Sequence, residues 1–366
     1  MSRKRFRDYG FAVGKLPTGK HNSISDVPGV AVGHVTLHTD TQDNSVRTGV
    51  TAILPHGGNV FREKVAAASY VINGFGKTTG LVQVNELGTV ESPIMLTNTF
   101  SVPAVTEGAL QYMMEMDAGI GEQAGSINIV TGECNDRLLN DMRGLHVRPK
   151  HAKEAIRQAA GDRPVAEGAV GAGTGMVCFG CKGGIGSSSR RITMSGKDYH
   201  IGVLVLTNFG RAEDLTILGQ PVGAHLRDKA VERGRGNNDG SIIIVLGTDV
   251  PMDARQLRRV AKRAGIGLAR TGSIAHHGSG DIVIAFSNGN RFQHEPEADL
   301  VSSTILREDG PLMSECFRAA ADATEEAIYN SLFMAESTRG HNGSEVQALS
   351  VEIVLPFLNN MQGKQS

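Results

Sequence analysis

The chain has 366 residues and a net charge of −1, so it is long enough for one large or two ordinary domains and lacks the basic excess typical of nucleic-acid binding. Glycine accounts for 46 residues, about 13 % against a typical ~7 %, which indicates many tight turns and close backbone approaches. No stretch reaches the ~20 apolar residues of a membrane span, the basic N-terminus precedes no apolar run, and four cysteines are too few for a disulfide framework. We therefore expect a cytoplasmic protein whose partners are neither membranes nor nucleic acids.

Short apolar runs along the chain predict strands. They cover residues 51–55, 92–98, 126–132, 200–208, 241–247, 281–287 and 350–357. Two amphipathic patterns predict helices: one follows Asp253, which forms a capping box with Gln256, and Gly265 is expected to end it; the other spans about 314–336. Because helices do not follow every strand, we expect a mixed α/β (α+β) protein rather than a regular doubly wound sheet.

The run at 241–247 differs from the others in how it begins. Its apolar core, 242–246, is so continuous that it predicts a strand buried on both faces. The preceding residues, 237–240, favour a turn within an exposed loop at 233–240. Ser241 is therefore expected at the mouth of a buried strand, directly after Gly240. The local sequence alone favours nothing more than a hairpin turn.

Three other motifs have simpler interpretations. Gly76-Lys77-Thr78 ends like a phosphate-binding loop, but Val71 stands where that loop needs its first glycine. The glycine-rich stretch 171–190 favours a connection that lets layers pack closely. Cys178 and Cys181 lack the second pair that a zinc site needs, so we expect them to be buried and inert, and we expect no metal or other cofactor.

A combination of segments spread along nearly the whole chain is more specific than any single motif. They are SISDVPGVAVGH (23–34), TGLVQVNELGTVESPIMLTNT (79–99), SINIVTGECND (126–136), GAVGAGTGMVCFGCKGGIGSSSR (168–190), VLVLTNFG (203–210), the stretch 239–273 and HGSGDIVIAFS (277–287). Together they resemble the DmpA-type self-processing aminopeptidases, which include the β-peptidyl aminopeptidases. The resemblance implies an αββα four-layer sandwich of the N-terminal-nucleophile hydrolase type, made as an inactive precursor.

The resemblance also implies that the precursor, a single catalytic domain over 1–366, cuts itself between Gly240 and Ser241. The products would be an α chain, 1–240, and a β chain, 241–366. Glycine suits such a bond because it has no Cβ to crowd the carbonyl under attack. Cleavage would leave Ser241 with both a hydroxyl and an α-amine whose ordinary pKa is ~7.7–8.0, so one residue would hold a nucleophile and a base.

Further roles follow from the matched motifs. Asn208 corresponds to the oxyanion-hole asparagine, and Ser279 and Asp281 to the serine and carboxylate that assist the nucleophile. Glu133 corresponds to the carboxylate that holds the substrate's free amine. Some relatives have glutamate in place of Asp281, and some have a tyrosine where this chain has Leu138.

The function implied is release of N-terminal residues from short peptides, amides or esters, with β- or D-amino acids included. An amidase or acyltransferase related to ornithine acetyltransferase is an alternative that would use the same N-terminal serine. A protein that binds a ligand and never cleaves itself is an alternative of another class. The resemblance further implies a homo-oligomer, a tetramer of α/β heterodimers.

Overall fold

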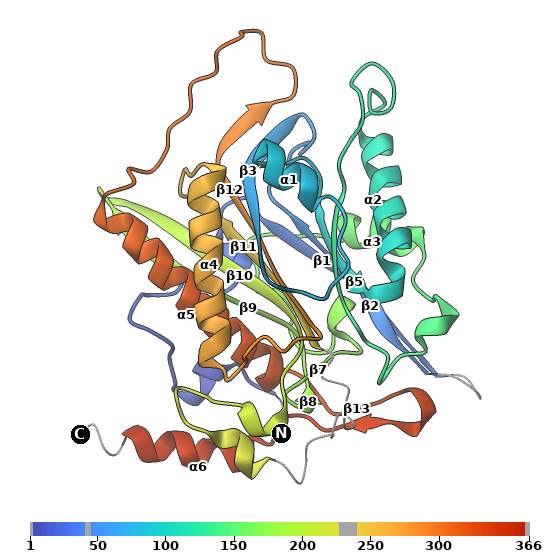
Figure 1. Cartoon of the computed structure of the whole chain (residues 1–366), viewed down its shortest axis with the longest axis vertical. Helices are drawn as coiled ribbons and strands as arrows, with labels where there is room; N and C mark the ends of the chain where they lie inside the picture. Colours follow the sequence, from blue (N-terminus) through green and yellow to red (C-terminus); the bar gives the residue numbers. More distant parts are fainter. Residues whose placement is uncertain (1–2, 41–44, 227–239, 363–366) are drawn as a thin grey trace.

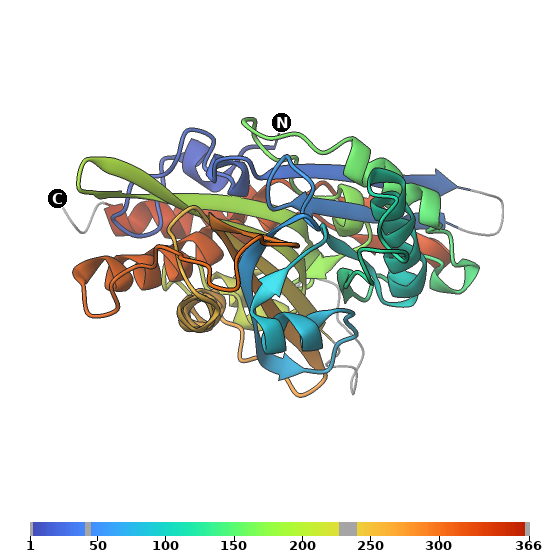
Figure 2. The ribbon, with the colours of Figure 1, turned by 90° about the horizontal axis from the view of Figure 1, so that it is seen from above.

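Two β-sheets stack face to face between two layers of helices (Figures 1 and 2). The computed structural model describes residues 3–40, 45–226 and 240–362. The order of layers confirms the αββα sandwich and the mixed α/β class expected from the sequence. Over the described residues, no helix is both long and apolar enough to cross a bilayer.

The smaller sheet has the strand order β1–β2–β5–β6. Its strands are β1 (Ala31–Asp40), β2 (Ser45–Leu54), β5 (Ile94–Asn98) and β6 (Val130–Cys134). β5 and β6 run parallel, and the other neighbours are antiparallel. Helices α2 (Val102–Met116) and α3 (Pro149–Arg157) cover the outer face of this sheet.

The larger sheet has the strand order β4–β3–β12–β11–β10–β9. Its strands are β3 (Glu63–Gly74), β4 (Thr89–Val90), β9 (Gly184–Met194), β10 (Lys197–Asn208), β11 (Gly240–Thr248) and β12 (Ser279–Gln293). β11 and β12 are parallel neighbours at the centre. Helices α4 (Ala254–Arg270) and α5 (Pro311–Phe333) cover the outer face, so β11 is buried along its whole length, as predicted.

Shorter elements complete the chain. They are helix α1 (Leu81–Leu87), the hairpin of β7 (Val177–Cys178) and β8 (Cys181–Lys182), the hairpin of β13 (Thr338–Arg339) and β14 (Glu345–Val346), and helix α6 (Val351–Gln362). The four cysteines are buried, as predicted for Cys178 and Cys181. The expected glycine-rich connection extends only to the β7–β8 hairpin, because residues 184–194 form β9.

Side chains alternate along β11 between two apolar cores. Ile243 and Val245 enter the core between the two sheets, whereas Ile242 and Ile244 pack toward α4 and α5. Because successive side chains on a strand point to opposite faces, Ser241 shares the face of Ile243. The serine hydroxyl is therefore directed toward the smaller sheet.

The strand predicted at 350–357 is wrong, since these residues belong to α6. Val351, Val354 and Leu358 are buried, whereas Glu352 and Pro356 are exposed. Buried positions separated by three and four residues follow the period of a helix rather than that of a strand. The apolar run therefore forms a helix that buries one face and exposes the other.

The capping box at the start of α4 is confirmed, because the Asp253 side chain accepts the Gln256 N–H at 2.7 Å. The predicted end at Gly265 is wrong, since the helix continues to Arg270. The glycine that follows the helix is Gly272, whose φ of +101° suits a residue without a Cβ. The predicted loop at 233–240 lies outside the described residues except for Gly240, which begins β11.

Candidate active site

The Gly240–Ser241 bond lies at the start of the central strand of the larger sheet. In the register of the sheet, Ser241 pairs with Asn208 of β10, and Gly240 pairs with Ser279 of β12. The Ser241 hydroxyl donates a hydrogen bond to the Gly240 carbonyl oxygen at 2.5 Å. Three of the residues predicted to act together are therefore brought to one end of three neighbouring strands.

Gly240 occupies a position with little room for a side chain. A Cβ built there would lie 3.1 Å from the Phe209 Cα and 3.4 Å from the Asn208 carbonyl oxygen. Any larger residue would push the end of β10 away from β11. The glycine thus keeps the end of β10 close to the bond that precedes Ser241.

Asn208 ends β10 with its side chain almost fully buried. Its Oδ1 atom accepts the Val177 backbone N–H at 3.0 Å, so the oxygen end of the amide is fixed by β7 and the NH2 end is the donor. Directly paired residues of antiparallel strands have Cβ atoms about 4.5–5.5 Å apart. Asn208 is therefore one short side chain away from Ser241.

Ser279 and Asp281 form a hydrogen-bonded pair at the start of β12. The Ser279 hydroxyl donates to the Asp281 Oδ1 atom at 2.6 Å, and Asp281 is fully buried. Burial raises the pKa of Asp281 to about 6, although the Ser279 hydroxyl, the charge of His276 and the Ile242 N–H all favour its ionised form. Asp281 pairs in register with Ile242, one residue beyond Ser241.

Asn73, on β3, fixes the segment that leads into this pair. Its Nδ2 group donates to the carbonyl oxygens of Ser279, His276 and His277 at 2.5, 3.1 and 3.0 Å. No local pattern in the sequence singles out Asn73, because its contacts depend on the antiparallel pairing of β3 with β12.

Glu133 is buried on β6, the edge strand of the smaller sheet. Its Oε1 atom accepts the Lys77 backbone N–H at 2.8 Å, and the Thr99 hydroxyl donates to its Oε2 atom. Burial raises the pKa of Glu133, and these two donors oppose the rise. Each carboxylate oxygen keeps a further lone pair, since a carboxylate oxygen accepts about two hydrogen bonds.

Glu133 lies on the side of the larger sheet toward which Ser241 is directed. A Cβ built on its neighbour Gly132 would lie 3.3 Å from the Ile243 side chain, so β6 packs against β11. A Cβ built on Gly76 would lie 3.3 Å from the Gly280 Cα and 3.7 Å from the Glu133 Oε1 atom. The loop around Gly76 therefore lies between the Glu133 carboxylate and Gly280, which pairs in register with Ser241. The segment 76–78, which only partly matched a phosphate-binding loop, contributes backbone to the site instead.

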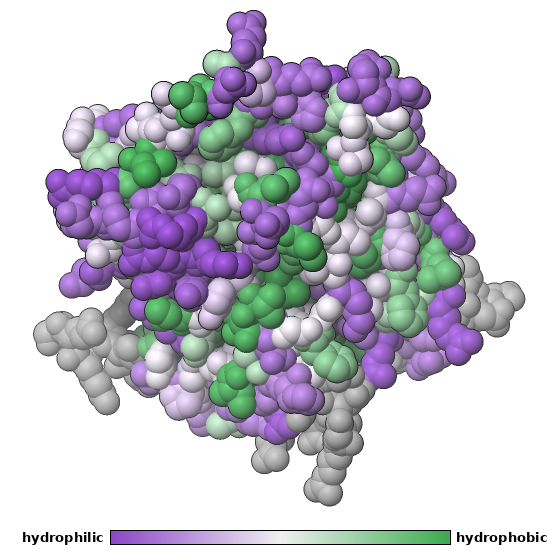
Figure 3. All heavy atoms as spheres, turned by 45° about the horizontal axis from the view of Figure 1, so that its top comes forward, coloured by the Kyte–Doolittle hydropathy of each residue, from purple (hydrophilic) through white to green (hydrophobic). Residues whose placement is uncertain are grey.

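Two aromatic side chains next to the Glu133 donors remain half exposed. Phe75 precedes Gly76 and is 54 % exposed, and Phe100 follows Thr99 and is 53 % exposed. On the face drawn in Figure 3, hydrophobic residues form separate groups among hydrophilic ones. Leu138, at the position of a tyrosine in some relatives, packs against an apolar cluster that includes Val177.

The sequence analysis did not assign a role to Thr99, although this residue is the last of the segment 79–99 that carries the family resemblance. The signal was the threonine after a buried strand, since hydroxyls at strand ends commonly bond to neighbouring polar groups. Within the described ranges, no group of three or more His, Cys, Asp or Glu side chains is arranged to hold a metal ion.

Comparisons with known proteins concern the family and the fold. Residues 22–346 match the model of the family described as peptidase family S58. The chain is 41 % identical over 362 residues to the beta-peptidyl aminopeptidase BapA of Sphingosinicella microcystinivorans, covering 94 % of this chain and 89 % of that protein.

Two solved structures extend the comparison to the fold, and each match covers 98 % of this chain and 99 % of the other. The PH0078 protein of Pyrococcus horikoshii OT3 superposes with a TM-score of 0.91 at 47 % identity. The L-aminopeptidase D-Ala-esterase/amidase of Ochrobactrum anthropi, described as a variant of the Ntn hydrolase fold, superposes with a TM-score of 0.89 at 34 % identity.

Proposed function

The chain belongs to peptidase family S58 and is an aminopeptidase, and from that premise we propose that it activates itself by cutting its own chain between Gly240 and Ser241. The observation that carries the proposal is the 2.5 Å hydrogen bond from the Ser241 hydroxyl to the Gly240 carbonyl, which brings the nucleophile beside the bond to be cut. The cut would turn one catalytic domain, 1–366, into the chains 1–240 and 241–366.

The self-cleavage proceeds in two steps, an acyl shift from nitrogen to oxygen and the hydrolysis of the resulting ester. The Ser241 Oγ atom attacks the Gly240 carbonyl carbon and gives up its proton, and the Ser241 nitrogen leaves with that proton as an amine, so that an ester replaces the amide. Water then hydrolyses the ester, releasing the Gly240 carboxylate and restoring the Ser241 hydroxyl. The product is a serine whose α-amine can accept a proton near neutral pH.

Asn208 supplies the donor for the oxyanion in both self-cleavage and peptide hydrolysis. Its amide is oriented by Val177 and lies beside Ser241 in the register of the sheet. A preorganised donor stabilises the charge that develops on the attacked carbonyl oxygen, because it needs no reorganisation during the reaction.

The Ser279–Asp281 pair acts on the new α-amine. That amine would lie in the plane of the sheet, on the residue before Ile242, which pairs in register with Asp281. The Ser241 hydroxyl, in contrast, is directed toward the smaller sheet. A buried carboxylate stabilises the ammonium form, so the pair lets the amine take the hydroxyl proton during attack.

Glu133 binds the free ammonium of the substrate. Its carboxylate is buried, held at both oxygens and aligned on the Ser241 side of the sheet. Phe75 and Phe100 offer apolar surface for the side chain of the residue released, and the substrates are short peptides, amides or esters, with β- and D-residues included. The resemblance supports a homo-oligomer, a tetramer of the two-chain unit, which light scattering of the purified protein tests.

The amidase or acyltransferase alternative differs in what it needs from Glu133. An N-acetylated peptide carries no charge for the carboxylate to hold, so we expect the wild type to turn over free-amine p-nitroanilides and not their acetylated forms. Glu133→Gln should raise KM for free-amine substrates and leave the yield of self-cleavage unchanged. Equal turnover of acetylated and free-amine substrates would favour the amidase.

Denaturing electrophoresis tests the cleavage. The wild type should give fragments of 240 and 126 residues (366 − 240), and the smaller should begin Ser-Ile-Ile-Ile-Val on N-terminal sequencing. Ser241→Ala should remain intact, folded and inactive, whereas Ser241→Cys keeps a nucleophile and should still be cut. Full activity of an uncut wild-type chain would contradict the proposal, and so would a fragment with another first residue.

A further inference from the structure

Lys182, on β8, is a charged side chain with no exposed surface. Its Nζ group donates to the carbonyl oxygens of Gly173, Met176 and Gly183 at 3.0, 2.9 and 2.8 Å. An ammonium has three donors, and all three are used. Burial lowers the pKa of Lys182 to about 7, while the nearby Cys178 and Asp136 favour its charged form.

The three acceptors span the segment 173–183, and that segment holds the end of β10. The Val177 N–H donates to the Asn208 Oδ1 atom at 3.0 Å, and the Phe179 N–H donates to the Phe209 carbonyl at 2.7 Å. Just beyond the segment, the Gly184 N–H donates to the Thr207 hydroxyl at 3.2 Å. Thr207, Asn208 and Phe209, at the end of β10 and just after it, are thus bonded to residues 177–184, most of which lie in the segment that Lys182 holds together.

We propose that Lys182 is a positioning residue for Asn208: its ammonium holds the segment 173–183 in the one shape in which the Val177 N–H fixes the Asn208 amide beside the Gly240–Ser241 bond. The proposal rests on the oxyanion role proposed for Asn208. Removing the ammonium takes a donor from three buried carbonyl oxygens, of which those of Gly173 and Met176 keep a backbone donor. The bonds that join the three carbonyls are lost, and we expect the segment to shift so that the Gly183 carbonyl finds a new donor. Val177 then moves, and the Asn208 amide loses the contact that orients it.

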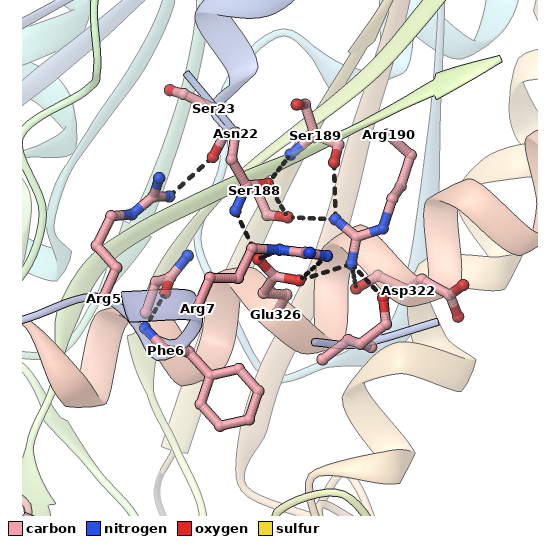
Figure 4. A network of polar contacts seen from close by, with 12 residues as sticks. Arg5, Phe6, Arg7, Asn22, Ser23, Ser188, Ser189, Arg190, Asp322 and Glu326 are labelled. Carbon is pink, nitrogen blue, oxygen red and sulfur yellow. Dashed lines mark hydrogen bonds and ion pairs between the residues drawn. The ribbon is translucent and has the colours of Figure 1, made fainter. Parts of the chain in front are cut away.

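A buried cation elsewhere in the molecule serves as the matched control. Arg190 is also fully buried, and it donates to the carbonyl oxygens of Val13, Ser189 and Asp322 (Figure 4). It pairs with Glu326 on α5. Arg190 therefore shares with Lys182 the burial, the charge and the bonds to backbone, but not the bonds to the segment that orients Asn208.

A double-mutant cycle tests the proposal. We isolate the cleaved fraction of wild type, Lys182→Met, Asn208→Ala and the double variant, because variants without the proposed oxyanion donor should also cut themselves more slowly, and we express kcat per cleaved chain. Because a misplacement of about 1 Å can cost ~10²-fold in rate, we expect Lys182→Met to lower kcat by on the order of 10–100-fold with KM changed less than about threefold. In the Asn208→Ala background the same substitution should lower kcat by less than about twofold, because the residue it positions is gone.

Arg190→Met should lower the unfolding temperature, and any effect that it has on kcat should be the same in both backgrounds. Equal losses of kcat from Lys182→Met with and without Asn208 would overturn the inference, and so would an unchanged kcat. Lys182→Gln, which keeps two N–H donors, is the second variant. Failure of both variants to fold would assign Lys182 to stability alone. If Asn208→Ala by itself left kcat unchanged, the proposed oxyanion role would fail instead.

Discussion

Asp281 and Glu326 are both fully buried, but their surroundings shift the pKa values of the two carboxyl groups in opposite directions. Burial alone would raise the pKa of Glu326, but the guanidinium groups of Arg190 and Arg7 lower it. Asp281 has no such pair, and among the described residues its Oδ2 atom has no hydrogen-bond partner. Upward shifts of this kind, caused by burial beside a nucleophile, are typical of catalytic groups.

The shift at Asp281 is also a cost in stability. Its pKa rises from an ordinary value near 3.8 to about 6 in the folded chain. The folded state therefore binds the proton more tightly than the unfolded state, so the stability this group contributes is present below about pH 4 and is lost as the pH rises through 6. At neutral pH the ionised Asp281 therefore destabilises the fold, and this is the form that the proposed role beside a Ser241 amine requires.

In the proposed mechanism the Ser241 α-amine, with an ordinary pKa of ~7.7–8.0, must be unprotonated and gives one acid limb in the pH profile of kcat/KM. We predict a second, lower acid limb with a midpoint near 6, the pKa of Asp281 in the uncut chain, because Asp281 must be ionised to act on that amine. Ser279→Ala removes a donor to the carboxylate, so the midpoint should move to higher pH. Asp281→Asn keeps an oxygen for the Ser279 hydroxyl but cannot ionise, and its slower reaction should lack this limb. An identical limb in Asp281→Asn would assign it to another group.

At the scale of elements, the sequence predicted the centre of the molecule better than its edges. β10, β11 and β12 were found because both faces of each are covered, which makes their residues continuously apolar. β9 was missed because it begins Gly-Ile-Gly-Ser-Ser-Ser, and its serines are buried through hydrogen bonds rather than by apolar contact.

The site was predictable in part for the same reason. Ser241 and Asn208 lie on strands that the apolar runs locate, so their motifs could be placed at strand ends. Thr99 and Lys182 could not be assigned roles, since each acts through a contact between segments far apart in the chain. Such contacts follow from how the layers pack, and a single sequence does not encode them in any local pattern.

Two glycines of α4 provide a matched test of layer packing. A Cβ at Gly267 would lie 2.3 Å from the Ala321 carbonyl oxygen of α5, whereas one at Gly265 would meet only the Ile72 side chain at 3.4 Å. In the Ser241→Ala background, Gly265→Ala should raise the free energy of unfolding by about 0.5–1 kcal/mol through helix propensity. Gly267→Ala should lower it by about 1–3 kcal/mol, because the two helices must separate. Denaturant titrations measure both, and similar effects at the two positions would contradict the packing of α4 on α5.

At the scale of the whole molecule, the proposed cut separates two chains that remain interleaved. β11 and β12 belong to 241–366, and they lie between β3 and β10 of 1–240 in the larger sheet. Of the four layers, only the larger sheet would take strands from both chains, because the smaller sheet with α2 and α3 belongs to 1–240, and α4 and α5 belong to 241–366. The cut can free an amine at Ser241 without opening the fold.

Ion pairs in Figure 4 join the same two parts of the chain: the half-buried Arg7 and the buried Arg190 precede the proposed cut, and the buried Glu326 follows it. Removing one partner of a buried ion pair costs about 3–5 kcal/mol, because the other charge stays buried without compensation. Glu326→Ala should therefore lower the free energy of unfolding by that order in both the cut and the uncut protein, as measured by denaturant titration.

The control is Asp309→Ala, which breaks an exposed pair with Arg307 and should change stability by less than about 1 kcal/mol.

We expect the wild-type fragments to co-elute in native size-exclusion chromatography and to separate only in denaturant. For the cut protein, the midpoint should rise with protein concentration, because unfolding then releases two chains from one complex. The uncut Ser241→Ala protein should show no such dependence. Fragments that separated under native conditions would mean that the pairing of β11 with β10 and of β12 with β3 does not survive the cut.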